Sequence, residues 1–364
     1  MLLLGTPARG WGQEAIAEPT AAVPPPEPAS TGSEDKAELL WSGRLFVGDL
    51  LTRQRIAGET FWRNRQTVNS ARLGLRYRRP EDSLKAVIKL EVEGGNAKLR
   101  DGYLSLGASE GLAVQAGRFK RQMSGIALAS KWDLPSIERG LLGTLEVEGQ
   151  ELPFSGGRGD GLMLGYQAEA RGKPAVSVSL FQNQLGYGAG SLDAKEHFAQ
   201  DAYLRVSAEP VEGLQLASSL AFIGYLKTVG DSDSFKHAPV GSLELSYKAG
   251  WLRIWAEGFA GKSMFAKLDG TSSGRFWAAR SLIALNLKPS VPRRLLPFVG
   301  VSYFDPRASE GDDANTEFQA GLNLAFAKTW RLQFELSQSL AEGTSSSAIE
   351  STAFRIQLGA RFKE

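Results

Sequence analysis

Apolar and polar residues alternate along most of the chain, and the segment 352–362 shows the pattern clearly. Its two sets of alternate positions are Phe354, Ile356, Leu358, Ala360 and Phe362 on one side, and Arg355, Gln357, Gly359 and Arg361 on the other. Successive side chains of a β-strand point to opposite faces. The segment is therefore predicted to be a strand with one apolar face and one wet, partly cationic face.

The same alternation recurs in sixteen segments, most of about 9 to 11 residues, separated by Gly, Pro, Asp or Ser. They are 43–51, 67–78, 83–93, 97–107, 112–120, 160–170, 174–183, 199–209, 213–226, 240–249, 250–262, 275–287, 296–305, 316–327, 330–340 and 352–362. An even number of such strands is what a closed antiparallel barrel requires.

The predicted connections alternate between short and long. The short ones are 79–82, 108–111, 171–173, 210–212, the junction 249–250, 288–295 and 328–329. The long polar ones are 121–159, 184–198, 227–239, 262–274, 306–315 and 341–351. Membrane barrels have tight periplasmic turns and longer external loops, so this rhythm favours a transmembrane barrel.

Charge on alternate positions decides which face would meet lipid. No stretch approaches the roughly 18 apolar residues of a membrane helix, so a chain that spans a bilayer must do so as a barrel. A Lys or Arg facing lipid costs about 2–4 kcal/mol at the midplane, so the charged face should line the lumen.

A soluble β-sandwich is the alternative. Aromatic residues near strand ends favour the membrane: Tyr77, Tyr103, Trp251, Tyr303, Trp330 and Phe362.

We therefore predict an all-β fold, a sixteen-stranded antiparallel transmembrane β-barrel of a Gram-negative outer membrane. The barrel is expected over residues 41–364. Residues 1–40 are expected to hold the remnant of a signal peptide, from Leu2 onward, followed by a disordered linker around Pro24–Pro26. A leader without a targeting role is the alternative for the first residues.

Composition narrows the function classes. Hydrophobic residues make up 42% of the chain, and 42 basic against 40 acidic residues give a net charge of +2. This balance offers no bulk attraction to nucleic acid. The chain has no Cys, which excludes disulfides, thiolate catalysis and Cys-based metal sites. No cofactor or metal is predicted.

The stretch from Ser70 to Lys120 carries a more specific signal. It contains an Arg-rich strand, an acidic-Gly-Gly-Asn turn, an Asp-small-Tyr-Leu strand and a Gly-x-Phe-Lys strand end. The matching positions are Arg72, Gly74, Gly95, Asn96, Asp101, Tyr103, Gly117, Phe119 and Lys120, with Ile137–Arg139 and Gly157, Arg158 and Gly161 beyond them. Residues 67–165 thereby resemble the phosphate-selective porin O and P family.

The resemblance implies a sixteen-stranded barrel, usually a trimer, that passes small anions. In one respect the chain departs from that family, because the crowded ladder of pore arginines and lysines has no matching positions here. Expected partners are outer-membrane lipid and lipopolysaccharide, small anions and two further copies of the chain.

The alternation along each predicted strand places a set of basic side chains on the face that would line the lumen. The candidates are Arg72, Arg76, Arg78, Lys85, Lys89, Arg205, Arg253, Arg280, Arg355 and Arg361. Their acidic counterparts are Glu91, Glu93, Asp101, Glu244, Glu257, Glu317 and Glu335. Guanidinium groups suit phosphate, whereas carboxylates across the lumen weaken that field, so only a mild anion preference is predicted. The alternative is a structural wall in which Arg72 or Lys89 pairs with Glu91 or Asp101.

The segment 121–159 is long enough to fold into the lumen. Its candidate constriction residues are Lys131, Trp132 and Arg139. Long loops in compact proteins are usually functional or disordered, and a surface lid or a complete plug are the alternatives.

An enzyme is the last alternative, since Gly270–Gly274 has the spacing of a nucleophile elbow. Its only possible bases, His197 and His237, fall in predicted loops, so a loop without catalysis is favoured. The predicted function is a porin for passive diffusion of small hydrophilic solutes. A non-conducting barrel that serves as an enzyme or surface-binding scaffold is the runner-up.

Overall fold

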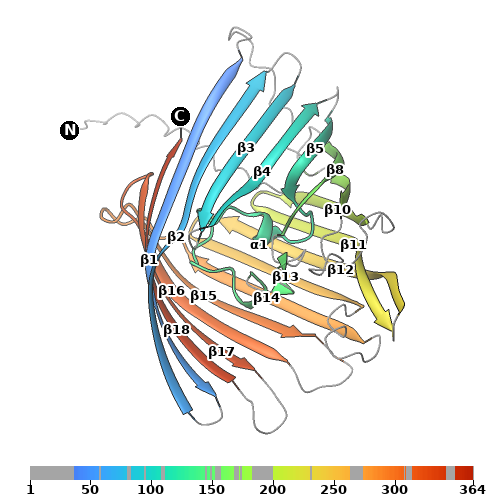
Figure 1. The fold of residues 1–364 in the computed structure, drawn as a ribbon. Coiled ribbons are helices and arrows are strands. Elements are labelled where there is room, and N and C mark those ends of the chain that lie inside the picture. The colour runs from blue at the N-terminus through green and yellow to red at the C-terminus, as the bar shows by residue number, and fades with distance from the viewer. Residues whose placement is uncertain are drawn as a thin grey trace, which may run out of the picture.

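The barrel is seen in a computed structural model. It describes residues 37–56, 59–79, 83–93, 96–107, 111–143, 146–147, 150–151, 157–167, 172, 174–182, 200–229, 232–262, 274–306, 308, 314–341 and 349–363. Within these ranges, sixteen antiparallel strands close into a barrel in which β1 pairs with both β2 and β18 (Figure 1). The predicted fold class is confirmed. The expected signal-peptide remnant and most of the linker, residues 1–36, lie outside the described residues.

The barrel strands follow the chain in order, apart from a small hairpin, β6–β7, inside the longest connection. They are β1 (Glu38–Ile56), β2 (Glu59–Arg79), β3 (Leu84–Glu93), β4 (Asn96–Gly107), β5 (Leu112–Lys120), β8 (Arg158–Gln167), β9 (Ala175–Gln182), β10 (Gln200–Val211), β11 (Leu214–Val229), β12 (Ser232–Ala249), β13 (Leu252–Lys262), β14 (Arg275–Leu285), β15 (Arg294–Asp305), β16 (Asn315–Ala325), β17 (Trp330–Ala341) and β18 (Ile349–Lys363). The hairpin consists of β6 (Glu146–Val147) and β7 (Gln150–Glu151).

Each predicted strand overlaps one observed strand, but two connections differ from the prediction. The segment 227–239 was expected to be a long loop, and this is wrong because β11 and β12 pair as far as Val229 and Ser232. His237 therefore lies in a strand. The segment 52–66, which lies between two predicted strands, forms the half of a long β1–β2 hairpin that adjoins its loop.

The outside of the barrel is apolar and the inside is polar. Outward positions of the strands carry exposed leucine, valine and aromatic side chains, for example Leu90, Leu164 and Leu358. Buried inward positions carry charged and amide groups such as Glu335 and Gln333. Such a surface is stable against hydrocarbon rather than water. Of the helices in the described part of the chain, none has the length and hydrophobicity to cross a membrane.

An apolar cluster lies inside the barrel, which the alternation pattern did not predict. Strands β5 and β8 to β15 contribute inward aromatic and aliphatic side chains that pack with Met123 and Leu142 of the long connection. The cluster is centred on Phe181, Tyr203, Ile223, Phe259, Phe276 and Phe304. Tyr103, expected at the membrane interface, also packs against this cluster, so that expectation is wrong. This half of the lumen is filled by protein.

Two β-bulges interrupt the ladder on the opposite side. The register of β2 against β1 skips Asn69, and the register of β4 against β3 skips Arg100. Each bulge adds a second inward side chain beside its neighbour: Asn69 donates to Gln357, and Arg100 to Glu91. The bulges thus enrich the lumen wall in polar groups.

Candidate functional site

The connection between β5 and β8 runs through the lumen. It contains α1 (Gly125–Leu128) and the 3-10 helix η1 (Leu141–Gly143). Figure 1 shows α1 within the outline of the barrel, between the strands of opposite walls. We call residues 121–143 the lumen loop. It contacts strands that are far apart around the barrel, so its position is fixed from several sides.

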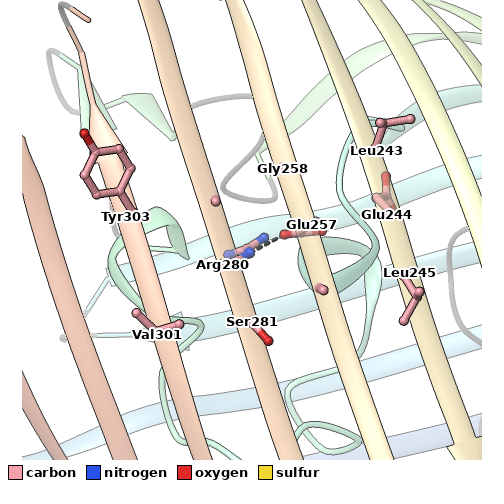
Figure 2. Close-up of a pocket in the computed structure, with 11 residues that line it drawn as sticks. Leu243, Glu244, Leu245, Glu257, Gly258, Arg280, Ser281, Val301 and Tyr303 are labelled. Atoms are coloured by element: carbon pink, nitrogen blue, oxygen red, sulfur yellow. Dashed lines mark hydrogen bonds and ion pairs between the residues drawn. The ribbon is translucent and has the colours of Figure 1, made fainter.

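Side chains of the wall hold the first part of the lumen loop. Ser124 caps α1, accepting from the amide of Ala127 at 3.0 Å, and donates to Glu257 of β13 at 2.9 Å. Glu257 also accepts from the amide of Ile126 and pairs with Arg280 of β14, as Figure 2 shows. These bonds satisfy the amide groups that a helix start leaves without partners inside the helix.

The carboxyl end of α1 is held from the other side. Lys120 donates to the carbonyls of Ala127, Leu128 and Ala129 at 2.9, 2.7 and 3.2 Å. A buried ammonium group is costly unless it is well hydrogen-bonded, and three carbonyl acceptors meet that need. Lys120 therefore has a structural contact with the loop.

The second part of the loop is bound to β17 (Trp330–Ala341). Glu335 accepts from the amides of Ile137 and Glu138 at 2.7 and 3.3 Å. Arg331 donates to the carbonyls of Lys131 and Trp132 at 2.9 and 2.7 Å, and Gln333 donates to Pro135 at 3.0 Å. The wall thus supplies both donors and acceptors to a backbone that forms no regular structure of its own.

Trp132 lies between wall residues at the β1–β18 seam. Its ring stacks on Phe46 with centroids 5.8 Å apart, and the guanidinium groups of Arg331 and Arg361 lie 4.5 and 4.7 Å from its centroid. The next residue, Asp133, is partly buried, and burial raises the pKa of its carboxyl although four nearby cations oppose that shift. These cations are Arg361, Lys248, Arg331 and Arg253.

The wall formed by β1 to β4 carries the densest charge network. Glu91 accepts from Arg72 at 2.8 Å and from Arg44 at 3.4 Å, and also pairs with Arg100. Asp101 pairs with Lys89 at 2.9 Å and with Arg158 of β8 at 2.7 Å. Each carboxylate is thus surrounded by two or three cations.

Exposure differs between the two signs of charge on this wall. The side chains of Glu91 and Asp101 are 1% and 7% exposed, whereas those of Arg72 and Lys89 are 17% and 21% exposed. The carboxylates lie behind the cations, so a solute in the lumen would meet the cations first. The local field is therefore more positive than the charge count suggests.

The predicted basic residues divide into three groups. Arg72, Lys89 and Arg355 are inward and paired with Glu91, Asp101 and Glu335. Arg205 and Arg280 are fully buried by pairing with Glu244 and Glu257, which removes them from any water-filled path. The others lie on the inner face near the short-turn rim: Arg76, Arg78, Lys85, Arg253 and Arg361.

The three predicted constriction residues all belong to the lumen loop. Lys131 lies 3.8 Å from Glu93 of β3, and Trp132 stacks on Phe46. Arg139 donates to Ala129 at 2.8 Å, and its own carbonyl accepts from Arg280. Lys131 and Arg139 thus add two cations to the lumen.

Several charged residues of the site were absent from the sequence-based candidates. Arg44 and Arg331 follow the inward parity of β1 and β17, so the alternation pattern contained their signal. Arg100 had no such signal because a bulge places it inward. Arg158 begins a strand after a long connection, where no regular pattern precedes it.

Two further features of the described residues concern the outer wall and metal binding. An apolar groove of about 440 Å³ crosses β12 to β15, lined by outward Leu243, Leu245, Val301 and Tyr303 (Figure 2). Among the residues that the structure describes, no group of three or more His, Asp and Glu side chains could hold a metal ion. The enzyme-like segment 270–274 lies outside the described residues except for Gly274, as does His197.

Comparison with solved structures places the barrel among known folds. The outer membrane channel DcaP of Acinetobacter baumannii matches 91% of this chain and 99% of its own, with 13% identity and a TM-score of 0.62. An anion-selective porin from Comamonas acidovorans covers 90% of this chain and 100% of its own, with 14% identity and a TM-score of 0.61. The fold is that of a porin.

A third match is the trimer form of OmpT, an outer membrane protein of Vibrio cholerae. It covers 90% of this chain and 100% of its own, with 14% identity and a TM-score of 0.56. No family model matches the chain, and no curated protein matches it in sequence. The narrower resemblance to the phosphate-selective porin O and P family is therefore not confirmed.

Proposed function

We propose that the chain is a channel of a Gram-negative outer membrane through which small hydrophilic solutes diffuse passively. It has a mild preference for anions such as phosphate and performs no chemical step. The observation that carries the anion preference is the arrangement on β1 to β4, where Glu91 and Asp101 are buried behind Arg72, Lys89 and their neighbours. The anion-selective porin among the structural matches supports the same direction.

The lumen loop narrows the path in this proposal. Lys131 and Arg139 of this loop add positive charge inside the barrel, and the ring of Trp132 fills space beside Phe46 of β1. A solute would pass between this loop and the cations of β1 to β4, because inward aromatic and aliphatic residues of β9 to β15 form the apolar cluster on the other side. A dry wall on one side strengthens the interaction of an anion with the other.

Reversal potentials in planar bilayers under a salt gradient test the preference. Replacing Arg72, Arg76 and Lys89 together by Gln should lower the ratio of anion to cation permeability several-fold, as each exposed cation contributes to the field in the lumen. The matched control replaces Arg53, Arg55 and Arg118, three outward arginines, and should leave the ratio unchanged. An unchanged ratio in the first variant, or cation preference in the parent, contradicts the proposal.

A barrel closed by its own loop is the second candidate. The apolar cluster favours it, because Phe181, Tyr203 and Phe259 together with Met123 seal one half of the lumen. In that case the protein acts as a scaffold, and no conductance is expected from purified protein in any salt. Stepwise single-channel currents decide between the two functions.

We further propose a homotrimer that contacts outer-membrane lipid and lipopolysaccharide. Support for the trimer comes from the trimeric form of a structural neighbour. Sedimentation in detergent should give three chains per particle, and a monomer would end this part of the proposal.

A further inference from the structure

A salt bridge lies on the outer face of the barrel, among apolar outward side chains. Arg118 of β5 and Asp160 of β8 are directly opposite each other, and their charged groups are 3.2 Å apart. Both follow the outward parity of their strands, on which Ala116 and Leu162 are the preceding outward residues counted from the short-turn rim. The side chains of Arg118 and Asp160 are 28% and 54% exposed, so the pair is open to whatever surrounds the barrel.

This salt bridge lies within the part of the wall that faces the hydrocarbon core. Counted from the short-turn rim, three outward residues precede Arg118 on β5 and three precede Asp160 on β8. A membrane strand of about 9–11 residues has about five outward positions. On nearby β3, the outward residues from Leu84 to Val92 are all apolar. Arg118 and Asp160 therefore lie at a level where charge that faces lipid is unfavourable.

The Arg118 guanidinium can make more hydrogen bonds than the one it donates to Asp160. Hydrocarbon offers no acceptor for the remaining N–H groups. Gly102 lies opposite Arg118 on β4, and Ala116 is the next outward residue on β5, so no bulky side chain covers the guanidinium from these two positions. A second protein surface that carries a carboxylate can therefore reach it.

A carboxylate of this kind lies on the outer face of β1. Asp49 follows the outward parity of Val47 and Leu51, and it is placed between Ile356 of β18 and Gln66 of β2. Its Oδ1 atom is buried and has no hydrogen-bond partner among the described residues. A buried carboxylate oxygen is unfavourable unless it accepts a hydrogen bond. Asp49 thus lacks the donor that Arg118 can offer.

The positions of Asp49 and Arg118 on the wall suit a ring of three copies. Strands β1 to β5 lie side by side (Figure 1), so the two residues are four strands apart in a wall of sixteen, a quarter of the circumference. In a closed ring of three, each copy meets its neighbours through two faces about a sixth of the circumference apart. The observed separation is near that value and far from the half circumference that would build a linear chain.

We propose that Arg118 of one copy pairs with Asp49 of the next, so that the outer face of β4, β5 and β8 packs against the outer face of β1. This inference deepens the homotrimer proposed above and rests on it. The contact is heterologous, because each copy uses Arg118 toward one neighbour and Asp49 toward the other. Arg118 then bridges Asp160 of its own chain and Asp49 of the neighbouring chain, and all three charges are removed from lipid.

Chemical cross-linking of full-length protein tests the contact. The chain has no Cys, so the double variant Val47→Cys with Ala116→Cys introduces two thiols, each two residues from the proposed pair in the direction of the short-turn rim. Within one chain the two positions are about 19 Å apart across four strands. A bifunctional maleimide with a spacer of about 8 Å cannot span that distance, so it links them only between copies. We expect linked products of up to three chains, and none from either single variant.

Charge reversal tests the pairing itself in the same double-cysteine background. Arg118→Asp alone and Asp49→Arg alone should each lower the yield of linked product several-fold, because each places like charges opposite each other across the contact. The two reversals combined should recover most of the yield. The matched control is Arg275→Asp, an exposed arginine at the start of β14, and it should leave the yield unchanged. If Arg118→Asp does not fold, Arg118→Gln tests the same pair with a smaller loss of yield.

Each outcome supports or overturns the pairing. Linked products that require both cysteines and follow the charges support it. Linking through Ala116→Cys alone shows a contact between like faces, and linking that ignores the reversals shows that other residues hold the copies together, so either result overturns it. A protein that sediments as three chains but gives no linked product has its contact elsewhere, which overturns the pairing and leaves the trimer intact. Cross-linking needs no conductance, so recordings on the same sample test the proposed channel separately.

Discussion

On the wall of β1 to β4 the carboxylates lie behind cations that face the lumen, whereas on β12 to β17 they accept hydrogen bonds from the lumen loop. Glu91 and Asp101 represent the first arrangement and Glu257 and Glu335 the second. Both walls have the same strand alternation. The contrast shows two roles for a charged side chain that points into a barrel. It can set the electrostatic field that a solute meets, or it can hold an internal loop in place, and the role depends on the residues it pairs with.

The largest effect is expected on the packing wall from Glu257→Ala. The change removes the acceptor of Ser124 and Ile126 and leaves Arg280 buried without its carboxylate. Breaking a buried pair in this way costs about 3–5 kcal/mol. Unfolding in urea measures the loss of stability. Single-channel currents should become noisier, because the lumen loop is no longer anchored to β13. Glu317→Ala is the control, and an equal loss there would show that Glu257 has no special role.

Phe181→Ala and Leu180→Ala sharpen the contrast between the inside and the outside of one strand. Phe181 is 1% exposed in the apolar cluster, and Leu180, its neighbour, is 44% exposed on the outer face. The first change should cost about 3–5 kcal/mol because it leaves a cavity. The second should cost about 2 kcal/mol, since lipid closes over the smaller side chain. If the two variants lose equal free energy of unfolding in a urea titration, the apolar cluster contributes no more to stability than the outer face does.

A smaller loss is expected from Lys120→Met. The methionine keeps the apolar length of the side chain but deprives three carbonyls of α1 of their donor, which costs about 1–3 kcal/mol. Urea unfolding measures the change, and Lys98→Met, on the exposed end of β4, is the matched control. If Lys120→Met loses no more stability than Lys98→Met, water replaces the lysine as the donor to the three carbonyls of α1.

Asp133→Asn should have the smallest effect, and its sign depends on pH. Burial raises the pKa of Asp133 above its unfolded value, so the folded state holds the proton over a range in which the unfolded state has lost it. Stability should therefore fall as pH rises through that range and stay lower above it. The Asn variant should be slightly more stable than the parent at neutral pH and show a flatter profile. Thermal unfolding between about pH 4 and pH 8 checks this, and a parent that gains stability with rising pH contradicts it.

Strand parity predicted the fold because one side of every barrel strand must be apolar. Leu358 and Gln357 are on opposite sides of the wall as their alternation requires, and the same holds for Leu90 and Glu91. The inner apolar cluster was not predictable in this way, because Phe181 and Leu180 are both apolar and a lipid face can be assigned to either. Only packing against Met123 and Leu142 identifies the inner one.

The candidate site was predictable in part. Parity placed Arg72 and Lys89 on the inner face, but it could not show that Arg205 and Arg280 are sealed by carboxylates and by the lumen loop. Partners from distant strands decide exposure, and one-dimensional spacing does not contain them. The length of the segment 121–159 suggested a lumen loop, whereas its anchors on β13, β14 and β17 became visible only in three dimensions.

The bulges at Asn69 and Arg100 have a consequence for insertions and deletions. Removing either residue would restore a regular ladder and leave every other side chain on its present side of the wall. Removing an ordinary neighbour such as Leu73 would shift the parity of the residues that follow and turn arginines toward lipid. These two positions are therefore places where the strands can change length by one residue, at the cost of a single polar group in the lumen.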